Sequence, residues 1–178
     1  MEQCIIEKGA ITYKGEKLFT AESGASFADF AKQALHFLQV DYPKFFKMDN
    51  LSKLAFLAAE VLLQALPPEE KKGVALLFAN RSASLDTDLR HQRSIADPNN
   101  YYPSPAVFVY TLPNICLGEV SIRHGLHTEN AFFVFDAYPE DFFTQYSSLL
   151  LQRRLAERVL CAWVDFLEGN YKAVATLI

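Results

Sequence analysis

Apolar residues recur three and four positions apart in several segments of the chain. Residues 27–38 and residues 51–65 each place their apolar side chains on one stripe. This spacing is typical of helices that bury one face. Asp49 or Asn50 can cap the second helix, and Pro67 with Pro68 ends it. The pattern therefore predicts two amphipathic helices in the first third of the sequence.

Short, nearly continuous apolar runs separate these stripes. Residues 73–79 and 131–135 contain almost no polar side chain, as is typical of strands that are covered on both faces. Residues 4–13 predict an opening strand that bends at Gly9, and residues 171–178 predict a closing strand. We expect these four runs to contribute to one sheet.

Two longer segments complete the pattern. Residues 106–124 predict a helix that is broken or begins near Pro113, and residues 141–168 carry a long stripe that predicts one helix, ended by Gly169. Helices and strands thus alternate along the chain. This order predicts a single α/β domain over residues 1–178, with a mainly parallel, covered sheet.

Charge and composition narrow the classes of function. The net charge is −4 and no basic stripe is present, which argues against a nucleic-acid partner. Glu60 and Gln64 interrupt the longest apolar stretch, and the first residues lack a long apolar h-region, so we expect no signal peptide and no membrane association. Cys4, Cys116 and Cys161 are odd in number and far apart. Reduced thiols in a cytoplasmic protein are the simpler interpretation.

The segment over residues 102–126, YPSPAVFVYTLPNICLGEVSIRHGL, carries the most information. It resembles the stretch of β-ketoacyl synthases in which a helix with an Asn, small residues and a Gly precedes the strand that leads to the nucleophile. The order of the flanking segments is similar as well, so the resemblance covers nearly the whole chain. The positions that match are Pro105, Phe108, Thr111, Asn114, Gly118, Glu119, Ser121 and Gly125.

The resemblance implies half of a thiolase-like fold, with a central mixed five-stranded sheet and helices on both faces. It also implies that residues 156–177 form a helix, a Gly and a strand. In the family, a reactive Cys stands in the tight turn after the strand. Asp136 and Ala137 occupy that position here, and the family's two histidines and its lysine have no counterpart in these residues.

The missing groups exclude the family's reaction for this chain alone. Claisen condensation needs a thiolate that accepts the acyl group, and a carboxylate at the same place would form an unstable mixed anhydride. The resemblance therefore implies a non-catalytic subunit of a fatty-acid-type or polyketide-type pathway, with no cofactor. Its partner would be a full-length ketosynthase or an acyl carrier protein.

Two other functions remain open on the sequence. Ser121, His124 and Asp136 are the residue types of a hydrolytic triad for esters or thioesters, although Ser121 lacks the G-x-S-x-G elbow. A homodimeric scaffold with a closed ancestral cleft is the other alternative. His124 and His127 are spaced as metal ligands can be, but no third ligand accompanies them, so we expect no metal site.

Two segments are candidate interfaces. The strand over residues 131–135 is aromatic, uncharged and free of proline, and an exposed edge of this kind invites pairing with another chain. We expect a homodimer or a heterodimer through Phe132, Phe133 and Val134.

The second candidate is a mixed-charge stretch that contains Arg90 and Arg93. These arginines could receive the acidic surface of an acyl carrier protein. Asp86 and Asp88 lie nearby in sequence and weaken that hypothesis, so a solvated helix face is the simpler interpretation.

Overall fold

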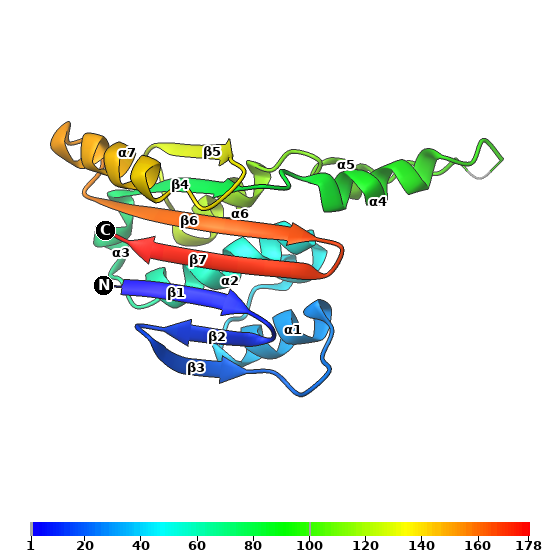
Figure 1. Ribbon diagram of the computed structural model, residues 1–178, viewed down its shortest axis with the longest axis horizontal. Helices are drawn as coiled ribbons and strands as arrows, with labels where there is room; N and C mark the ends of the chain where they lie inside the picture. The colour runs from blue at the N-terminus through cyan, green and yellow to red at the C-terminus, as the bar shows by residue number, and fades with distance from the viewer. Residues whose placement is uncertain (1, 100) are drawn as a thin grey trace.

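One mixed sheet of seven strands organises the chain, in the order β3-β2-β1-β7-β6-β4-β5. The computed structural model describes residues 2–99 and 101–178 (Figure 1). The α/β class expected from the sequence is correct, but the sheet has seven strands, not five. The strands are β1 (Glu2–Glu7), β2 (Ala10–Tyr13), β3 (Glu16–Thr20), β4 (Val74–Asn80), β5 (Asn130–Val134), β6 (Arg158–Leu167) and β7 (Asn170–Leu177).

Three two-residue turns account for the additional strands. Lys8-Gly9, Lys14-Gly15 and Glu168-Gly169 all have positive φ at both residues, the geometry of tight hairpins with a right-handed twist. The first two turns fold the N-terminal segment into the antiparallel strands β1, β2 and β3. The prediction of one strand bent at Gly9 was therefore wrong, because a glycine preceded by lysine forms a hairpin turn here.

The long apolar stripe over residues 141–168 is not one helix. Helix α7 (Glu140–Gln152) ends before Arg153, and β6 begins at Arg158. Strand β6 is buried on both faces from Val159 to Val164, so its sequence lacks the alternation that distinguishes a strand from a helix. For the same reason residues 156–177 are a hairpin of β6 and β7, and not a helix followed by a strand.

Parallel pairing is confined to one end of the sheet. Strand β4 pairs in parallel with both β5 and β6, whereas the other four pairings are antiparallel. The expectation of a mainly parallel sheet was wrong, since the hairpins at both ends of the sequence contribute antiparallel strands.

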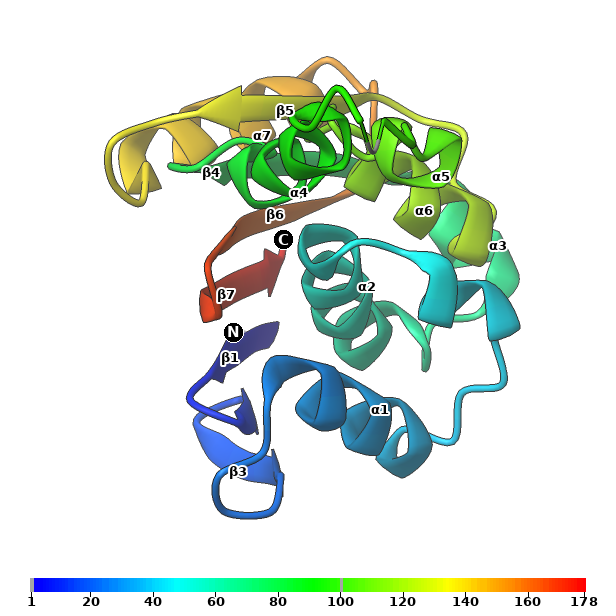
Figure 2. The same cartoon turned by 90° about the vertical axis from the view of Figure 1, so that its right-hand side faces the viewer.

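Helices lie on both faces of the sheet, but they cover them unequally. Helix α7 lies in front of β4 and β6 in Figure 1, and three helices of ten residues or more lie behind the sheet, as Figure 2 shows from the side. The larger core joins these three helices to β1, β7, β6 and β4, and a smaller core joins α7 to β4, β5 and β6. The helices behind the sheet are α1 (Phe27–Phe37), α2 (Asn50–Leu63) and α6 (Ile115–His124), with the short η1 (Pro43–Lys47) and α3 (Pro68–Lys72) between or after them.

A helical arm extends beyond the sheet. It consists of α4 (Leu85–Ile95), a connecting loop and α5 (Pro105–Phe108), and we call residues 85–99 and 101–108 the arm. Figure 1 shows it pointing away from the strands. Within α4 only Thr87 is buried, so the arm contributes almost nothing to the core.

Candidate functional site

The turn between β5 and α7 has the strand–turn–helix form expected for the nucleophile position. The N–H of Phe135 donates to the carbonyl of Asn80 at 2.9 Å and closes the parallel ladder. The chain then turns through Asp136 and Ala137, which are both exposed, and α7 begins at Glu140. We call residues 135–139 the elbow. Its turn presents a carboxylate and a methyl group, and no thiol.

The three thiols lie outside the elbow, and their burial makes them unreactive. Cys4, Cys116 and Cys161 are all buried and free. Burial raises the pKa of Cys4 to about 12, and it raises the pKa of Cys161 to about 12 although a hydrogen bond with Ser147 opposes the shift. Burial also raises the pKa of Cys116 well above its ordinary value. No thiolate is therefore available near neutral pH.

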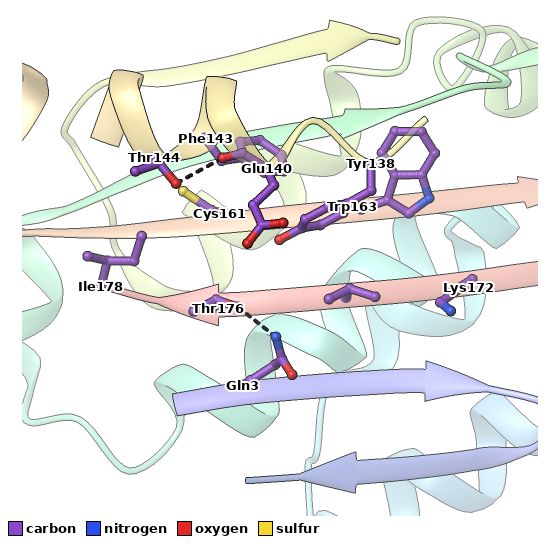
Figure 3. A pocket seen from close by; sticks show the side chains of 11 residues that line it. Gln3, Tyr138, Glu140, Phe143, Thr144, Cys161, Trp163, Lys172, Thr176 and Ile178 are labelled. Carbon is purple, nitrogen blue, oxygen red and sulfur yellow. Dashed lines mark hydrogen bonds between the residues drawn. The ribbon is translucent and has the colours of Figure 1, made fainter. Parts of the chain in front are cut away.

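An open groove of about 550 Å³ lies beside the elbow on the face of the sheet that α7 only partly covers. Figure 3 shows side chains from the start of α7 above the groove and side chains of β6 and β7 along it, with Gln3 of β1 at the far wall. Gln3 donates to the hydroxyl of Thr176 at 3.4 Å. The residues that line the groove include Gln3, Tyr138, Glu140, Cys161, Trp163 and Thr176.

The groove has the character of a contact surface more than of a reaction centre. The Tyr138 and Trp163 rings meet edge to face at 6.4 Å, and Cys161 is only 3% exposed. Tyr138 and Glu140 stand at its exposed rim. A nucleophile with a base in hydrogen-bond reach is absent from these lining residues. The sequence could not indicate this groove, because its walls come from four separate segments.

The three motif positions on and beside α6 have different local roles. Asn114 precedes the helix, but its side chain makes no capping hydrogen bond. Gly125 has φ +67° and ends the helix, with its N–H bonded to the carbonyl of Ser121, so glycine is required there by backbone geometry. Gly118 is exposed in the helix, and a Cβ added there would meet no atom within 4 Å.

The residues of the alternative triad are not brought together. No hydrogen bond joins Ser121, His124 and Asp136, and His124 instead faces Glu60, with 3.7 Å between Nε2 and Oε1. Burial lowers the pKa of His124 to about 3, and the charges of Lys71 and Arg123 add to the shift. His124 is therefore neutral near pH 7, and the geometry gives no support to a hydrolase.

The partner of Glu60 is Arg123. This carboxylate is fully buried, and the Arg123 Nε bonds its Oε1. The guanidinium group also lies over the Tyr42 ring, 5.4 Å from its centroid. A buried carboxylate paired in this way ties α6 to α2. The pair fixes the helix that leads into β5.

Strand β5 lies at the edge of the sheet, as the hypothesis of pairing through residues 131–135 requires. Because Phe135 donates to β4 and alternate residues point the same way, the N–H groups of Phe132 and Val134 point to the open side. Val134 is 57% exposed. Phe133 instead packs into its own chain, with its ring 4.7 Å from Phe142 and 5.9 Å from Tyr146 of α7.

The part of the chain that the structure describes contains no cluster of three or more metal-binding side chains. No helix among the described residues is long and apolar enough to cross a membrane.

No family model and no curated protein matches this sequence. Solved structures do match. The ishigamide ketosynthase/chain length factor aligns with a TM-score of 0.72 and 15% identity, covering 99% of this chain and 60% of its own. A ketosynthase (ApeO) in complex with its chain length factor (ApeC) from Xenorhabdus doucetiae aligns with a TM-score of 0.58 and 18% identity, covering 78% and 60%.

A third match is AntDE:AntF, a type II PKS acyl-carrier protein in complex with its ketosynthase bound to the hexaketide. It has a TM-score of 0.61 and 14% identity, and the alignment covers 99% of this chain and 63% of that chain. At these identities the likeness is one of fold, and the fold is ketosynthase-like. The chain spans about 60% of the length of the structures that it matches.

Proposed function

Since this ketosynthase-like fold carries an elbow without a nucleophile, we propose that the chain is a non-catalytic partner of a full-length ketosynthase in a polyketide-type pathway. The elbow is the observation that carries the proposal. Strand β5, the turn and α7 form a strand–turn–helix unit, and the family resemblance assigns Asp136 and Ala137 of that turn to the position of the reactive Cys. A fatty-acid-type pathway uses the same condensation chemistry and is the other pathway in which such a partner could act.

The chemistry of the elbow supports a role without condensation. The ketosynthase reaction transfers the acyl group to a thiolate, and all three thiols here are buried with raised pKa values. Asp136 could not hold an acyl group, because a mixed anhydride hydrolyses readily. A subunit of this kind acts by the surfaces that it offers to its partners.

The edge strand β5 supports pairing. Its outward backbone groups are free to extend the sheet into another chain. Val134 at its end is 57% exposed, and an exposed apolar side chain on an open edge strand favours burial in an interface. A ketosynthase that presents its own corresponding edge would continue the sheet across the interface.

The experiment is a mixing test with a full-length type II ketosynthase, followed by sedimentation velocity and by a condensation assay. The assay uses malonyl- and acyl-loaded carrier protein. We expect a heterodimer, and we expect no β-ketoacyl product from the chain alone. Product formed by the purified chain would contradict the non-catalytic role.

Sedimentation of the chain alone separates two kinds of assembly. A homodimer that is stable alone and ignores the synthase would support the scaffold alternative. A monomer that remains monomeric with the synthase would contradict pairing altogether. We also propose a cytoplasmic location, because the three cysteines are free and a reducing compartment keeps them so.

A further inference from the structure

One wall of the groove beside the elbow is aromatic. Tyr138 of the elbow packs edge to face against Trp163 of β6 and Phe143 of α7, with ring centroids 6.4 and 5.7 Å apart. Tyr138 is 41% exposed, whereas Trp163 and Phe143 are buried. A molecule that enters the groove therefore meets the Tyr138 ring first, and two buried rings hold that ring in place.

The Glu140 carboxylate stands on the same side of the groove. Figure 3 shows its side chain extending from the start of α7 toward β7, beside Tyr138. Burial is the main cause that raises the pKa of Tyr138, and Cys161 and the negative charge of Glu140 add to the shift. Within residues 2–99 and 101–178 no basic side chain lies within 4 Å of the Glu140 carboxylate. An uncompensated negative charge thus lies next to an exposed aromatic ring.

The strands that form the floor of the groove do not supply the missing positive charge. Lys172 of β7 is the basic residue of the lining, and its Nζ lies 3.1 Å from Oε2 of Glu7 on β1. Asp165 of β6 accepts only backbone N–H groups, which are neutral and leave its charge in place. Arg81 at the end of β4 is exposed, and in the described chain it has no carboxylate within 4 Å.

The charges on the elbow and on α7 add to the negative excess. Asp136 of the elbow and Asp141 in the first turn of α7 are both exposed carboxylates. Arg153 and Arg154 follow the opposite end of the helix, about 20 Å from Glu140 along its axis. Around the aromatic wall, carboxylates therefore outnumber basic side chains, and a positively charged ligand is the one that this potential attracts.

Glu140 and Asp141 differ in what they face. Both lie in the first turn of α7, where a carboxylate stabilises the N-terminus of a helix. Only Glu140 lines the groove. Stabilisation of the helix is thus common to the two residues, whereas the position beside Tyr138 belongs to Glu140 alone. Asp141 is therefore a matched control for Glu140.

We propose that the groove binds a small organic ammonium ion. The Glu140 carboxylate pairs with the charge, and the Tyr138 ring offers the electron-rich face that attracts an ammonium group. Val174 and Ile178 contact the apolar substituents of the ion, and the hydroxyl of Thr176 bonds its polar end. The volume of about 550 Å³ lies within the usual range of small-molecule sites, roughly 300–1,000 Å³.

This inference goes beyond the proposed function and does not rest on it. The groove lies on one face of the sheet, between the start of α7 and the strands β6, β7 and β1, whereas the proposed pairing uses the outer edge of β5. Binding of a cation also requires no nucleophile, in agreement with the residues that line the groove.

The test compares choline with two molecules of similar shape, the neutral 3,3-dimethyl-1-butanol and the negatively charged 3,3-dimethylbutanoate. Trp163 is the only tryptophan of the chain, so its fluorescence reports occupation of the groove. Saturation-transfer NMR on the methyl groups of each ligand is an independent measure. We expect choline to bind at least about fivefold more tightly than the neutral molecule, and the butanoate to bind most weakly.

Two pairs of variants locate the site. We expect Glu140→Gln to weaken choline binding by about fivefold or more and Asp141→Asn by less than about twofold, although both remove one charge from the same turn. Tyr138→Leu should weaken it by about threefold or more. The control Tyr102→Leu, at a side chain of the arm that is 76% exposed, should leave it unchanged.

Three results would overturn the inference. Absence of saturable choline binding to the parent chain would leave no site, and equal affinity for choline and the neutral molecule would reduce the groove to an apolar surface. Equal losses in Glu140→Gln and Asp141→Asn would show attraction by the general charge of the helix end. The first two comparisons use the parent chain, so they do not depend on how the variants fold. Pairing with a ketosynthase is judged separately by sedimentation, because all four variants leave β5 unchanged.

Discussion

The two edges of the sheet differ in how they meet the solvent. Strand β3 at one edge carries Glu16 and Lys17, both exposed, whereas β5 at the other edge has the uncharged sequence NAFFV. Charged side chains on an edge strand discourage pairing with other chains. The β3 edge is therefore protected as the end of a sheet usually is, and the β5 edge has the composition of a strand awaiting a neighbour.

Each edge strand packs an aromatic side chain of one face against a helix. Phe19 of β3 packs against Phe37 of α1 at 5.1 Å, and Phe133 of β5 packs against Phe142 of α7 at 4.7 Å. Each strand is anchored by aromatic contacts to a helix. Both strands have one open edge, and the difference lies in their composition, because β3 carries charged residues and β5 carries none. That difference can be tested.

The largest expected effect comes from the anchor of β5. Replacement of Phe133 by Ala removes a ring that contacts Phe135, Phe142 and Tyr146. We expect a loss of about 3 kcal/mol in the free energy of unfolding, the usual cost of a large aromatic truncation. Urea denaturation of the chain alone measures it.

A charged residue at Phe133 would thus disturb the fold before it tested the interface. Phe19→Ala at the opposite edge is the comparison and should cost less, because Phe19 contacts two aromatic rings, those of Phe30 and Phe37, whereas Phe133 contacts three. An equal or larger cost at Phe19 would mean that the two anchors do not differ as described.

The next largest effect is on association. Val134→Lys places a charge at the exposed end of β5 without removing a core contact. We expect the affinity for a ketosynthase to fall by at least about tenfold, roughly 1.4 kcal/mol, while the free energy of unfolding changes by less than about 0.5 kcal/mol. Titration calorimetry and urea denaturation measure the two quantities.

The matched control is Leu18→Lys on β3, where the side chain is 37% exposed. It should leave the affinity for the synthase unchanged. If both lysine variants bound the synthase as the parent does, β5 would be no more an interface than β3.

A smaller effect is expected at Gly118 on α6, the helix that leads into β5. Gly118→Ala meets open space and should stabilise the isolated chain by about 0.5–1 kcal/mol through helix propensity. Thermal unfolding of the chain alone checks this. A destabilised variant would show that the exposed side of α6 is not free in the isolated chain.

The smallest effect is expected at the thiols of the interior strands β1 and β6. Iodoacetamide at neutral pH should label Cys4 and Cys161 slowly, because burial excludes the reagent and holds both pKa values at about 12. Cys116 should be equally slow. Mass spectrometry of the labelled peptides follows the rates, and rapid selective labelling of any one thiol would argue for a nucleophile after all.

Helix α1 buries one stripe and exposes the rest, whereas α2 has no exposed residue and begins at its Asp49 cap. The apolar spacing nevertheless predicted both helices correctly. It failed at β6, where burial of both faces from Val159 to Val164 removed the alternation. The hairpin turns at Gly9 and Gly15 were missed because lysine, not asparagine or aspartate, occupies the position before each glycine.

The candidate site was predicted in part. The edge position of β5 that the pairing hypothesis needs is present, and the N–H groups of Phe132 and Val134 point to that open edge. The assignment of Asp136 and Ala137 to the nucleophile position rests on the family resemblance and stays a prediction. The inward packing of Phe133 could not be foreseen, because α7 lies across β5 only in the folded chain. Nor could the sequence show that Asp86 and Asp88 are bonded within the chain and leave Arg90 and Arg93 without acidic partners.

Hydrogen exchange with mass spectrometry tests the central claim most directly, because it reads the backbone groups that the claim concerns. Peptides covering β5 (Asn130–Val134) and β3 (Glu16–Thr20) report both edges in one experiment. The account predicts that a full-length ketosynthase slows exchange in β5, at the outward amides of Phe132 and Val134, and leaves β3 unchanged. A complex that forms while β5 exchanges as fast as in the free chain, or that protects β3 instead, would contradict it.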